Sequence, residues 1–229
     1  MKYLILGDGK LATEIHKQTN WDYISRIKNG ILFEYPASYF DYLKQYDVII
    51  NCIGYTNTYD NAKDKHWKIN YLGVIDLVDL CNNLKKKLVH ISTDYIYTNS
   101  KSCATENDIP IHFENWYTYS KILADGYVQA KSNDYLLIRT SFKPRPFLWD
   151  NAWIDLLTNC DYIDVISELI IKLINGEAKG IYNVGTKLKT VYELALQTKE
   201  CAPIIDEHNF ERPHDITMNI DKLNNFLQI

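Results

Sequence analysis

The feature that most constrains the fold is a regular alternation of short apolar runs with segments of helical spacing. The runs typical of strands cover residues 2–6, 22–26, 31–35, 47–54, 87–92, 135–141 and 180–185. The segments of helical spacing cover residues 9–18, 36–45, 64–84, 114–130, 163–176 and 190–198. Parallel strands need crossover connections long enough to hold a helix, and these segments supply them. The pattern therefore predicts an α/β protein with an open, doubly wound, mostly parallel sheet.

Composition and charge are those of an ordinary globular protein. Of the 229 residues, 46% are hydrophobic and 24% charged, and the formal net charge is only -4, which gives no reason to expect a nucleic-acid partner. The five cysteines are dispersed and form no CxxC pair. No apolar run approaches the roughly 18 residues that a membrane span needs. We expect a soluble, cytoplasmic protein with reduced thiols, no membrane partner and no metal.

A glycine-rich turn follows the first predicted strand. The stretch GDGKLA, residues 7–12, fits the GxGxxA form of the dinucleotide-binding turn between a strand and a helix. Gly7 would permit the tight turn, Gly9 would let the backbone approach a pyrophosphate, and Ala12 would allow close packing of helix and strand. A plain strand-to-helix turn is the alternative. The turn predicts a Rossmann-like sheet with cofactor contacts from Gly7, Gly9, Lys10 and Leu11.

The end of the second predicted strand bears on which dinucleotide binds. An acidic residue there usually holds the ribose 2′-hydroxyl, whereas a basic residue suits a 2′-phosphate. Here the strand ends in Ser25 and Arg26, with Lys28 close behind. We therefore expect NADP(H) as the cofactor, with Arg26 among its contacts. NAD(H), or a solvated turn with no cofactor role, is the alternative.

Hydroxyl side chains end the strand predicted at 87–92. The stretch ISTDYIY, residues 91–97, places Ser92 and Thr93 at the carboxyl end of that strand. Ligands of open α/β sheets bind outside these ends, so both hydroxyls are expected to face a cleft. The alternative is that they satisfy only nearby backbone groups.

The stretch YTYSK, residues 117–121, places two tyrosines before one lysine. Residues four apart on a helix share a face and residues two apart do not, so Tyr117 neighbours Lys121 while Tyr119 points elsewhere. An ammonium beside a phenol favours the phenolate and would lower the pKa of Tyr117. Such a tyrosine can exchange a proton near neutral pH, as acid–base catalysis requires. Because the chain has 18 tyrosines, the pair gains weight only from its place in the sequence.

The order of these features is more specific than any one of them. With a glycine-rich turn, a Ser-Thr strand end and YxxxK on the next helix, the sequence resembles the extended, sugar-nucleotide-modifying branch of the short-chain dehydrogenase/reductase superfamily. The likeness is closest to the dTDP-4-dehydrorhamnose reductase family. ISTDYIY is similar to that family's STDYVF, IRTSF is similar to LRTSW, and ATENDIPIHFENWYTYSK resembles E-x-x-x-P-x-x-x-YGxSK with Thr118 in place of glycine. GIYNVG, ERP at 211–213 and NIDKL at 219–223 resemble C-terminal landmarks of the family.

The resemblance implies roles for individual residues. Tyr117 would be the general acid that protonates a keto oxygen, Lys121 would lower its pKa and bind the nicotinamide ribose, and Thr93 would bind the same oxygen. Asn70 would have a structural or proton-relay role, unless it is only a polar residue that kinks its helix. Substrate contacts would come from Asp94, Tyr95 and, at the nucleotide phosphates, Arg212.

The second half of the chain departs from the family pattern. Only residues 142–179 lie between the IRTS strand end and the GIYNVG strand, fewer than the family uses to build its substrate lobe. The glycine turn is GxGxxA where GxxGxxG is more usual. The segment TYDNAKDK, 58–65, is mixed in charge, so we expect no metal there. We predict a dinucleotide-binding domain at 1–141 and a small C-terminal substrate lobe at 142–229, interleaved with the last strand and helices of the same unit.

The resulting hypothesis is an NAD(P)H-dependent reductase of a nucleotide-linked 4-keto-6-deoxy sugar, in deoxysugar and polysaccharide biosynthesis. Hydride would come from the nicotinamide and the proton from Tyr117. One alternative is an epimerase or dehydratase of the same fold. Another is a non-catalytic NADP-binding regulatory subunit, which the shortened lobe favours and the set of Thr93, Tyr117 and Lys121 opposes. A homodimer through helices 64–84 and 114–130 is the expected assembly, because it is common for this fold.

Overall fold

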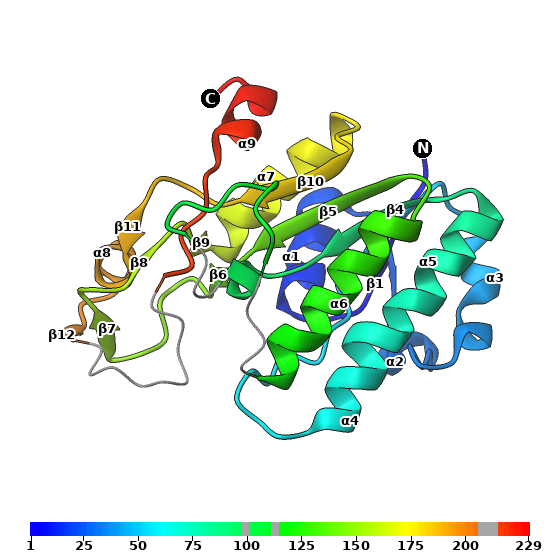
Figure 1. The fold of residues 1–229 in the computed structure, drawn as a ribbon, viewed down its shortest axis with the longest axis horizontal. Helices are drawn as coiled ribbons and strands as arrows, with labels where there is room; N and C mark the ends of the chain where they lie inside the picture. Colours follow the sequence, from blue (N-terminus) through cyan, green and yellow to red (C-terminus); the bar gives the residue numbers. More distant parts are fainter. Residues whose placement is uncertain (98–100, 111–114, 206–214) are drawn as a thin grey trace.

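Six parallel strands form the central sheet of the protein (Figure 1). The computed structural model describes residues 1–97, 101–110, 115–205 and 215–229. Every neighbouring pair of strands in this sheet is parallel, which confirms the predicted doubly wound α/β fold. The order across the sheet is β10 (Gly180–Val184), β5 (Tyr135–Thr140), β4 (Lys87–Ile91), β3 (Val48–Asn51), β1 (Tyr3–Leu6) and β2 (Asp22–Ile24).

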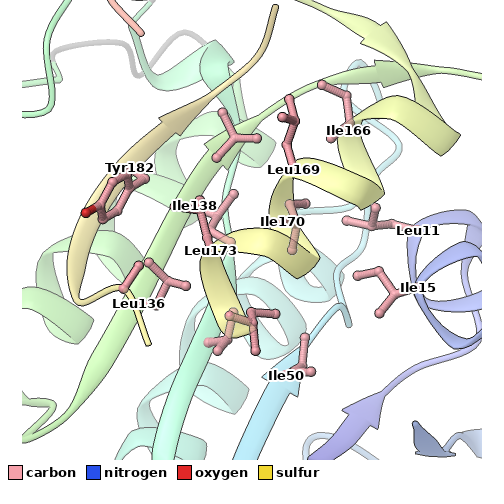
Figure 2. Close-up of a cluster of buried hydrophobic side chains, with 14 of the residues drawn as sticks. Leu11, Ile15, Ile50, Leu136, Ile138, Ile166, Leu169, Ile170, Leu173 and Tyr182 are labelled. Carbon is pink, nitrogen blue, oxygen red and sulfur yellow. The ribbon is translucent and has the colours of Figure 1, made fainter. Parts of the chain in front are cut away.

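Two helices cover one face of the sheet. Helix α1 (Lys10–Thr19) lies beside helix α7 (Ile163–Asn175), and each turns its apolar stripe toward the strands. The buried side chains that meet there include Leu11, Ile15, Ile50, Leu136, Ile138, Ile166, Leu169, Ile170 and Leu173 (Figure 2). Full burial of one aliphatic side chain contributes about 1.5–3 kcal/mol, so this layer holds both helices firmly on the strands.

The opposite face is covered mainly by helix α5 (Gly73–Leu84) and helix α6 (Trp116–Lys131), with the short helix α3 (Phe40–Leu43) beside them (Figure 1). These helices run side by side and bury an apolar stripe of their own, for example Leu77 and Val128. No helix in the described part of the chain is long and apolar enough to cross a membrane.

The helix predicted at 64–84 is built in three parts. A single turn, α4 (Lys63–Lys65), leads into a π-helical stretch at His66–Leu72, which continues as α5. Trp67 of the π-helical stretch stacks on Tyr119 of α6, with 6.4 Å between the ring centroids. A homodimer through these helices stays a prediction.

The strand predicted at 31–35 is wrong. Ile31 and Phe33 are buried and Leu32 is exposed, so the alternation that suggests a strand is real. The backbone of Leu32, however, is taken up by Ser38, whose hydroxyl accepts from the Leu32 amide and donates to its carbonyl, both at 2.9 Å. The segment therefore packs as an irregular turn before the 3-10 turn Pro36–Ser38, and β2 forms the edge of the sheet.

A small lobe follows the fifth strand of the sheet. Its described residues form three two-stranded pairs: β6–β9, β7–β12 and β8–β11 (Figure 1). Helix α7 and strand β10 return to the central sheet, and the final helix α9 (Asp221–Leu227) packs beside β10. The division into a dinucleotide-binding domain and a substrate lobe stays a prediction. The lobe's elements are β6 (Phe142–Lys143), β7 (Asn151–Trp153), β8 (Leu157–Thr158), β9 (Asp161–Tyr162), β11 (Lys189–Thr190), α8 (Val191–Leu196) and β12 (Ala202–Ile204).

Two helical glycines allow a matched test of how tightly α5 packs. A Cβ added at Gly73 would lie 2.6 Å from the buried ring of Phe33, whereas one added at Gly126 would have nothing within 4 Å. We expect Gly73→Ala to lower the free energy of unfolding by about 1–3 kcal/mol through overpacking. Gly126→Ala should raise it by about 0.5–1 kcal/mol, because alanine is the better helix former. Urea unfolding curves measure both changes, and a Gly73→Ala protein as stable as the parent would contradict this packing.

Candidate active site

One cavity of about 690 Å³ lies at the carboxyl ends of the parallel strands. Its volume is within the range of small-molecule sites. Open α/β sheets bind ligands at this edge, next to the strand at which the strand order reverses. In this sheet that strand is β1, because β2 lies on one side of it and β3 lies on the other. The lining includes Gly9, Cys52, Gly54, Thr93, Tyr117, Lys121, Ser141 and Lys143, with Trp153, Thr158 and Cys160 from the small lobe.

The glycine turn opens helix α1 toward the cavity. Gly7 has a φ of +110°, a value that other residues rarely adopt, and a Cβ there would lie 3.2 Å from Ile53. Gly9 precedes the first helical residue, and as a glycine it has no side chain that could cap the first amides of α1. Uncapped amides at a helix N-terminus attract anions. Lys10 and Leu11 line the cavity together with Gly9, whereas Gly7 is not among the described lining residues.

Helix α6 brings the two residues of the YxxxK motif to the same wall of the cavity. Tyr117 and Lys121 both line it, while Tyr119 is 37% exposed and contacts the rings of Trp67 and Trp116 outside. Asn115 begins the helix, because its side chain accepts a hydrogen bond from the Thr118 amide at 2.8 Å. The four-residue spacing on the helix therefore explains why Tyr117 shares the cavity wall with Lys121 while Tyr119 faces outward.

Thr93 meets Tyr117 across the cavity. Thr93 follows β4, is 5% exposed, and its hydroxyl lies near the phenol of Tyr117. Ser92 next to it is buried and also lines the cavity. A hydroxyl and a phenol that are neighbours on a cavity wall can both contact the same ligand oxygen.

The expected effect of Lys121 on Tyr117 is wrong for this structure. Burial raises the pKa of Tyr117 to about 12, and the nearby Thr93 hydroxyl only partly opposes this rise. The Lys121 ammonium nitrogen is turned to the backbone, where it donates to the Ile91 carbonyl at 2.7 Å. Burial also lowers the pKa of Lys121 to about 8, although the nearby Asp125 carboxylate favours the charged form. Desolvation therefore outweighs the neighbour effect that helical spacing predicts.

Asp94 and Tyr95 lie at the cavity wall beside Thr93. Asp94 is buried and accepts hydrogen bonds from Ser141 and from Thr93. Burial raises the pKa of Asp94 to about 6, against the hydrogen bond from Ser141 and the charge of Lys143. Burial also raises the pKa of Tyr95. The wall therefore carries a carboxyl group that titrates near neutral pH.

Asn70 ties the loop after β3 to the helices. Its amide group donates to the Tyr55 carbonyl at 2.9 Å and accepts from the Tyr55 amide at 2.7 Å. It also lies 3.3 Å from the Ser120 hydroxyl on α6. Asn70 sits within the π-helical stretch and is 1% exposed. These contacts are those of a structural residue.

The two arginines expected at the ligands, Arg26 at the cofactor and Arg212 at the substrate phosphates, are not among the described lining residues of the cavity. Arg26 is exposed at the start of helix α2 (Arg26–Asn29), and it is not among the described residues that line the cavity. Ser25 caps α2 by accepting from the Lys28 amide at 3.0 Å, and the Lys28 ammonium lies 3.8 Å over the ring of Tyr23. Arg212 belongs to residues 206–214, which the structure does not describe.

Sequence reasoning missed a buried ion pair under helix α6. Arg139 on β5 and Asp125 on α6 are 1% and 2% exposed, with 3.3 Å between Arg139 Nε and Asp125 Oδ2. Arg139 also donates to the Tyr97 hydroxyl at 2.5 Å. The pair fixes α6, and with it Tyr117 and Lys121, to the sheet. The available signal was an arginine inside the apolar run YLLIRT.

Fold and site together define a protein of the extended short-chain dehydrogenase/reductase class. The family profile described as the RmlD substrate binding domain matches residues 1–143, more than half of the chain. The chain belongs to that family. The family resemblance seen in the sequence is therefore confirmed.

Relatives of known name match over part of their length. A dTDP-4-dehydrorhamnose reductase of Mycolicibacterium smegmatis is 30% identical over 105 residues, which are 42% of this chain and 30% of that protein. The spore coat polysaccharide biosynthesis protein SpsK of Bacillus subtilis is 28% identical over 149 residues, 62% of this chain and 53% of the relative. The chain thus spans at most about half the length of these curated relatives.

Solved structures share the fold over nearly the whole chain. A hypothetical dTDP-4-dehydrorhamnose reductase from Sulfolobus tokodaii has a TM-score of 0.81 at 23% identity, covering 98% of this chain and 94% of its own. A dTDP-4-dehydrorhamnose reductase from Bacillus anthracis in complex with NADP has a TM-score of 0.81 at 22% identity, with 98% and 93% covered. At these identities the likeness concerns the fold.

The Arg139–Asp125 pair predicts a specific pattern of stability. We expect Arg139→Met to lower the free energy of unfolding by about 3–5 kcal/mol, because Asp125 is then left buried without its partner. Adding Asp125→Leu should recover part of that loss, since no buried charge remains. Urea unfolding of the two single variants and the double variant measures the coupling. A double variant whose loss equals the sum of the single losses would show that the pair is not coupled.

Proposed function

We propose that the protein is an NADP(H)-dependent reductase of a nucleotide-linked 4-keto-6-deoxy sugar. The observation that carries this proposal is the meeting of Thr93, Tyr117 and Lys121 in the same cavity as the glycine turn. A hydroxyl beside a phenol, a buried lysine and a helix N-terminus are the parts that such a reaction needs.

The cavity fits a nicotinamide dinucleotide. Its phosphates suit the uncapped amides of α1, beside Gly9, Lys10 and Leu11, and the positive φ of Gly7 keeps the turn tight enough for close approach. Cys52, Ile53 and Gly54 line the same side of the cavity. Lys121, which also lines the cavity, would hold the nicotinamide ribose. When bound, the dinucleotide supplies the hydride.

The chain's own residues supply and place the proton. Thr93 and Tyr117 are proposed to bind the keto oxygen, with Tyr117 as the proton donor. Because its pKa is raised to about 12, Tyr117 keeps its proton at neutral pH and can act as an acid. Lys121, turned from the Ile91 carbonyl to the ribose, would hold positive charge close to the phenolate that forms on proton transfer.

The substrate class rests on the relatives and on the wall of the cavity. Two relatives are named for a dTDP-linked keto sugar or for polysaccharide biosynthesis. Asp94 and Tyr95 are proposed to contact the sugar, and Arg212 to contact the nucleotide phosphates. The lobe residues Trp153 and Leu156 give an apolar surface on the far side of the cavity, suited to a 6-deoxy sugar or a base.

A dehydratase or epimerase of the same fold is the second candidate. Asp94 favours it, because this buried carboxyl beside Thr93 has a pKa of about 6 and can carry a second proton to the substrate. Such an enzyme would retain NAD⁺ through purification and show no net cofactor turnover, which the absorbance of the purified protein reveals. Cofactor binding without turnover on any keto sugar would instead point to a regulatory subunit.

The proton-donor role of Tyr117 predicts a large loss of activity on removal of its hydroxyl. We expect Tyr117→Phe to lower kcat for a dTDP-4-keto-6-deoxy sugar about 100- to 10,000-fold, the usual contribution of a general acid. NADPH binding should stay within a few fold. Tyr119→Phe is the matched control, because Tyr119 faces outward from the same helix, and it should leave kcat unchanged. Turnover of Tyr117→Phe within a few fold of the parent would refute the assignment.

The preference for NADPH is proposed to depend on Arg26 at the end of β2. We expect Arg26→Ala to weaken NADPH binding about tenfold and to leave NADH binding unchanged, since only NADPH carries a 2′-phosphate. Lys17→Ala removes an exposed cation of α1 that pairs with Glu14 and serves as the control. Fluorescence titration gives the dissociation constants. Equal effects of Arg26→Ala on both cofactors would place the 2′-phosphate elsewhere.

A further inference from the structure

Two polar side chains are buried side by side in the sheet directly behind Lys121. Asn51 on β3 and His90 on β4 are partners in register, and both are fully buried. Asn51 Nδ2 lies 3.1 Å from His90 Nδ1, and His90 Nε2 lies 3.5 Å from Lys121 Nζ. The three side chains form a chain that leads from the sheet interior to the amine that lines the cavity.

A backbone amide fixes which atoms donate and which accept in this series of three side chains. The Ile53 amide can only donate, and it lies 3.1 Å from Asn51 Oδ1, so the other atom of the Asn51 amide, Nδ2, faces His90 as a donor. His90 Nδ1 must then accept. Burial lowers the pKa of His90 well below its ordinary value, so the imidazole is neutral. A neutral imidazole that accepts at Nδ1 carries its proton on Nε2.

The proton on His90 Nε2 points at Lys121. An ammonium group has three donors and no lone pair, so a charged Lys121 and this N–H would present protons to each other. A neutral amine has a lone pair that can accept from His90 Nε2–H while one of its own protons goes to the Ile91 carbonyl at 2.7 Å. Every polar group in the chain is therefore satisfied only when Lys121 is neutral.

We propose that Asn51 and His90 are positioning residues that stabilise the neutral amine of Lys121 in the cofactor-free protein. The consequence for catalysis rests on the proposed function. When Lys121 turns to the cofactor ribose it leaves His90, and it takes up one proton from solvent to become the ammonium beside Tyr117. Cofactor binding is then coupled to the uptake of that proton.

The other groups around Lys121 do not hide the effect of His90 on its charge state. Asp125, one helical turn along α6, favours the ammonium, while the Arg139 guanidinium pairs with that carboxylate and weakens its effect. Burial raises the pKa of the Cys52 thiol and of the Tyr117 phenol to about 12, so both are neutral near pH 8. Asp94 stands beyond Tyr117. Lys121, with its pKa lowered to about 8, is thus poised where one hydrogen bond changes its state.

Nuclear magnetic resonance of the cofactor-free protein tests the proposal directly. The ¹⁵N shifts of His90 report which ring nitrogen carries the proton, and the ¹³Cε shift of Lys121 reports its titration, with Lys121→Met and His90→Leu identifying the signals. We expect the Nε2-protonated form at pH 7. His90→Leu and Asn51→Leu should each raise the Lys121 midpoint by roughly one pH unit. His66→Leu is the control, because it removes an equally buried imidazole whose Nδ1 lies near the Asn70 side-chain amide. It should leave the His90 ¹⁵N shifts and the Lys121 midpoint unchanged.

An Nδ1-protonated His90, or a Lys121 midpoint that stays in place in both leucine variants, would overturn the proposal. Circular dichroism shows whether His90→Leu folds. If it does not, the ¹⁵N shifts of His90 in the parent and the Lys121 midpoint in Asn51→Leu still test the proposal. Calorimetry with NADPH at pH 9, in buffers of different ionisation enthalpy, counts the protons taken up. We expect close to one in the parent and fewer in Asn51→Leu, with equal uptake in both contradicting the coupling. Absence of NADPH binding would refute the proposed function while leaving the resonance results to stand.

Discussion

The parallel pairing of β1, β3, β4 and β5 is the interaction on which the rest of the structure depends. Their registers place Leu6 beside Asn51, Asn51 beside His90, and Ile91 beside Ile138. All four strands therefore end at one edge of the sheet, and the segments that follow them line one cavity although they are far apart in sequence. Antiparallel pairing of any of these strands would send its following turn to the opposite edge.

Burial then sets the charge state of that cavity. It raises the pKa of Asp94 and of Tyr117, and it lowers that of Lys121, so in each case the neutral form gains. Asp94 and Lys121 therefore titrate closer to neutral pH than ordinary aspartate and lysine side chains do. Ligand phosphates, ribose hydroxyls and a developing oxyanion would each shift one of these equilibria, which links binding to proton transfer.

The architecture and the place of the site could be predicted from the sequence because both depend on local patterns. Strand and helix periodicity gave the order of elements, and the four-residue spacing separated Tyr117 from Tyr119. The strand at 31–35 could not be excluded, because it is Ser38, six residues further on, that occupies the backbone of Leu32. The charge state of Lys121 could not be predicted from the sequence either. It depends on His90, and the register of β3 and β4 is what places Asn51 beside His90.

The small lobe completes the cavity, and Lys143 of β6 is the charged residue that it adds to the described lining. Most side chains that it adds to the wall are apolar or carry a hydroxyl or thiol, as with Trp153, Thr158 and Cys160, whereas Asp94, Tyr117 and Lys121 come from the sheet and α6. Its strand pairs have two or three residues each and would be marginal alone, so they depend on α7 and β10, which return the chain to the central sheet. Shortening such a lobe changes which ligand the wall fits and leaves Thr93, Tyr117 and Lys121 in place. The chemistry of this protein is therefore fixed by its parallel sheet, and its selectivity by the short segments that close over it.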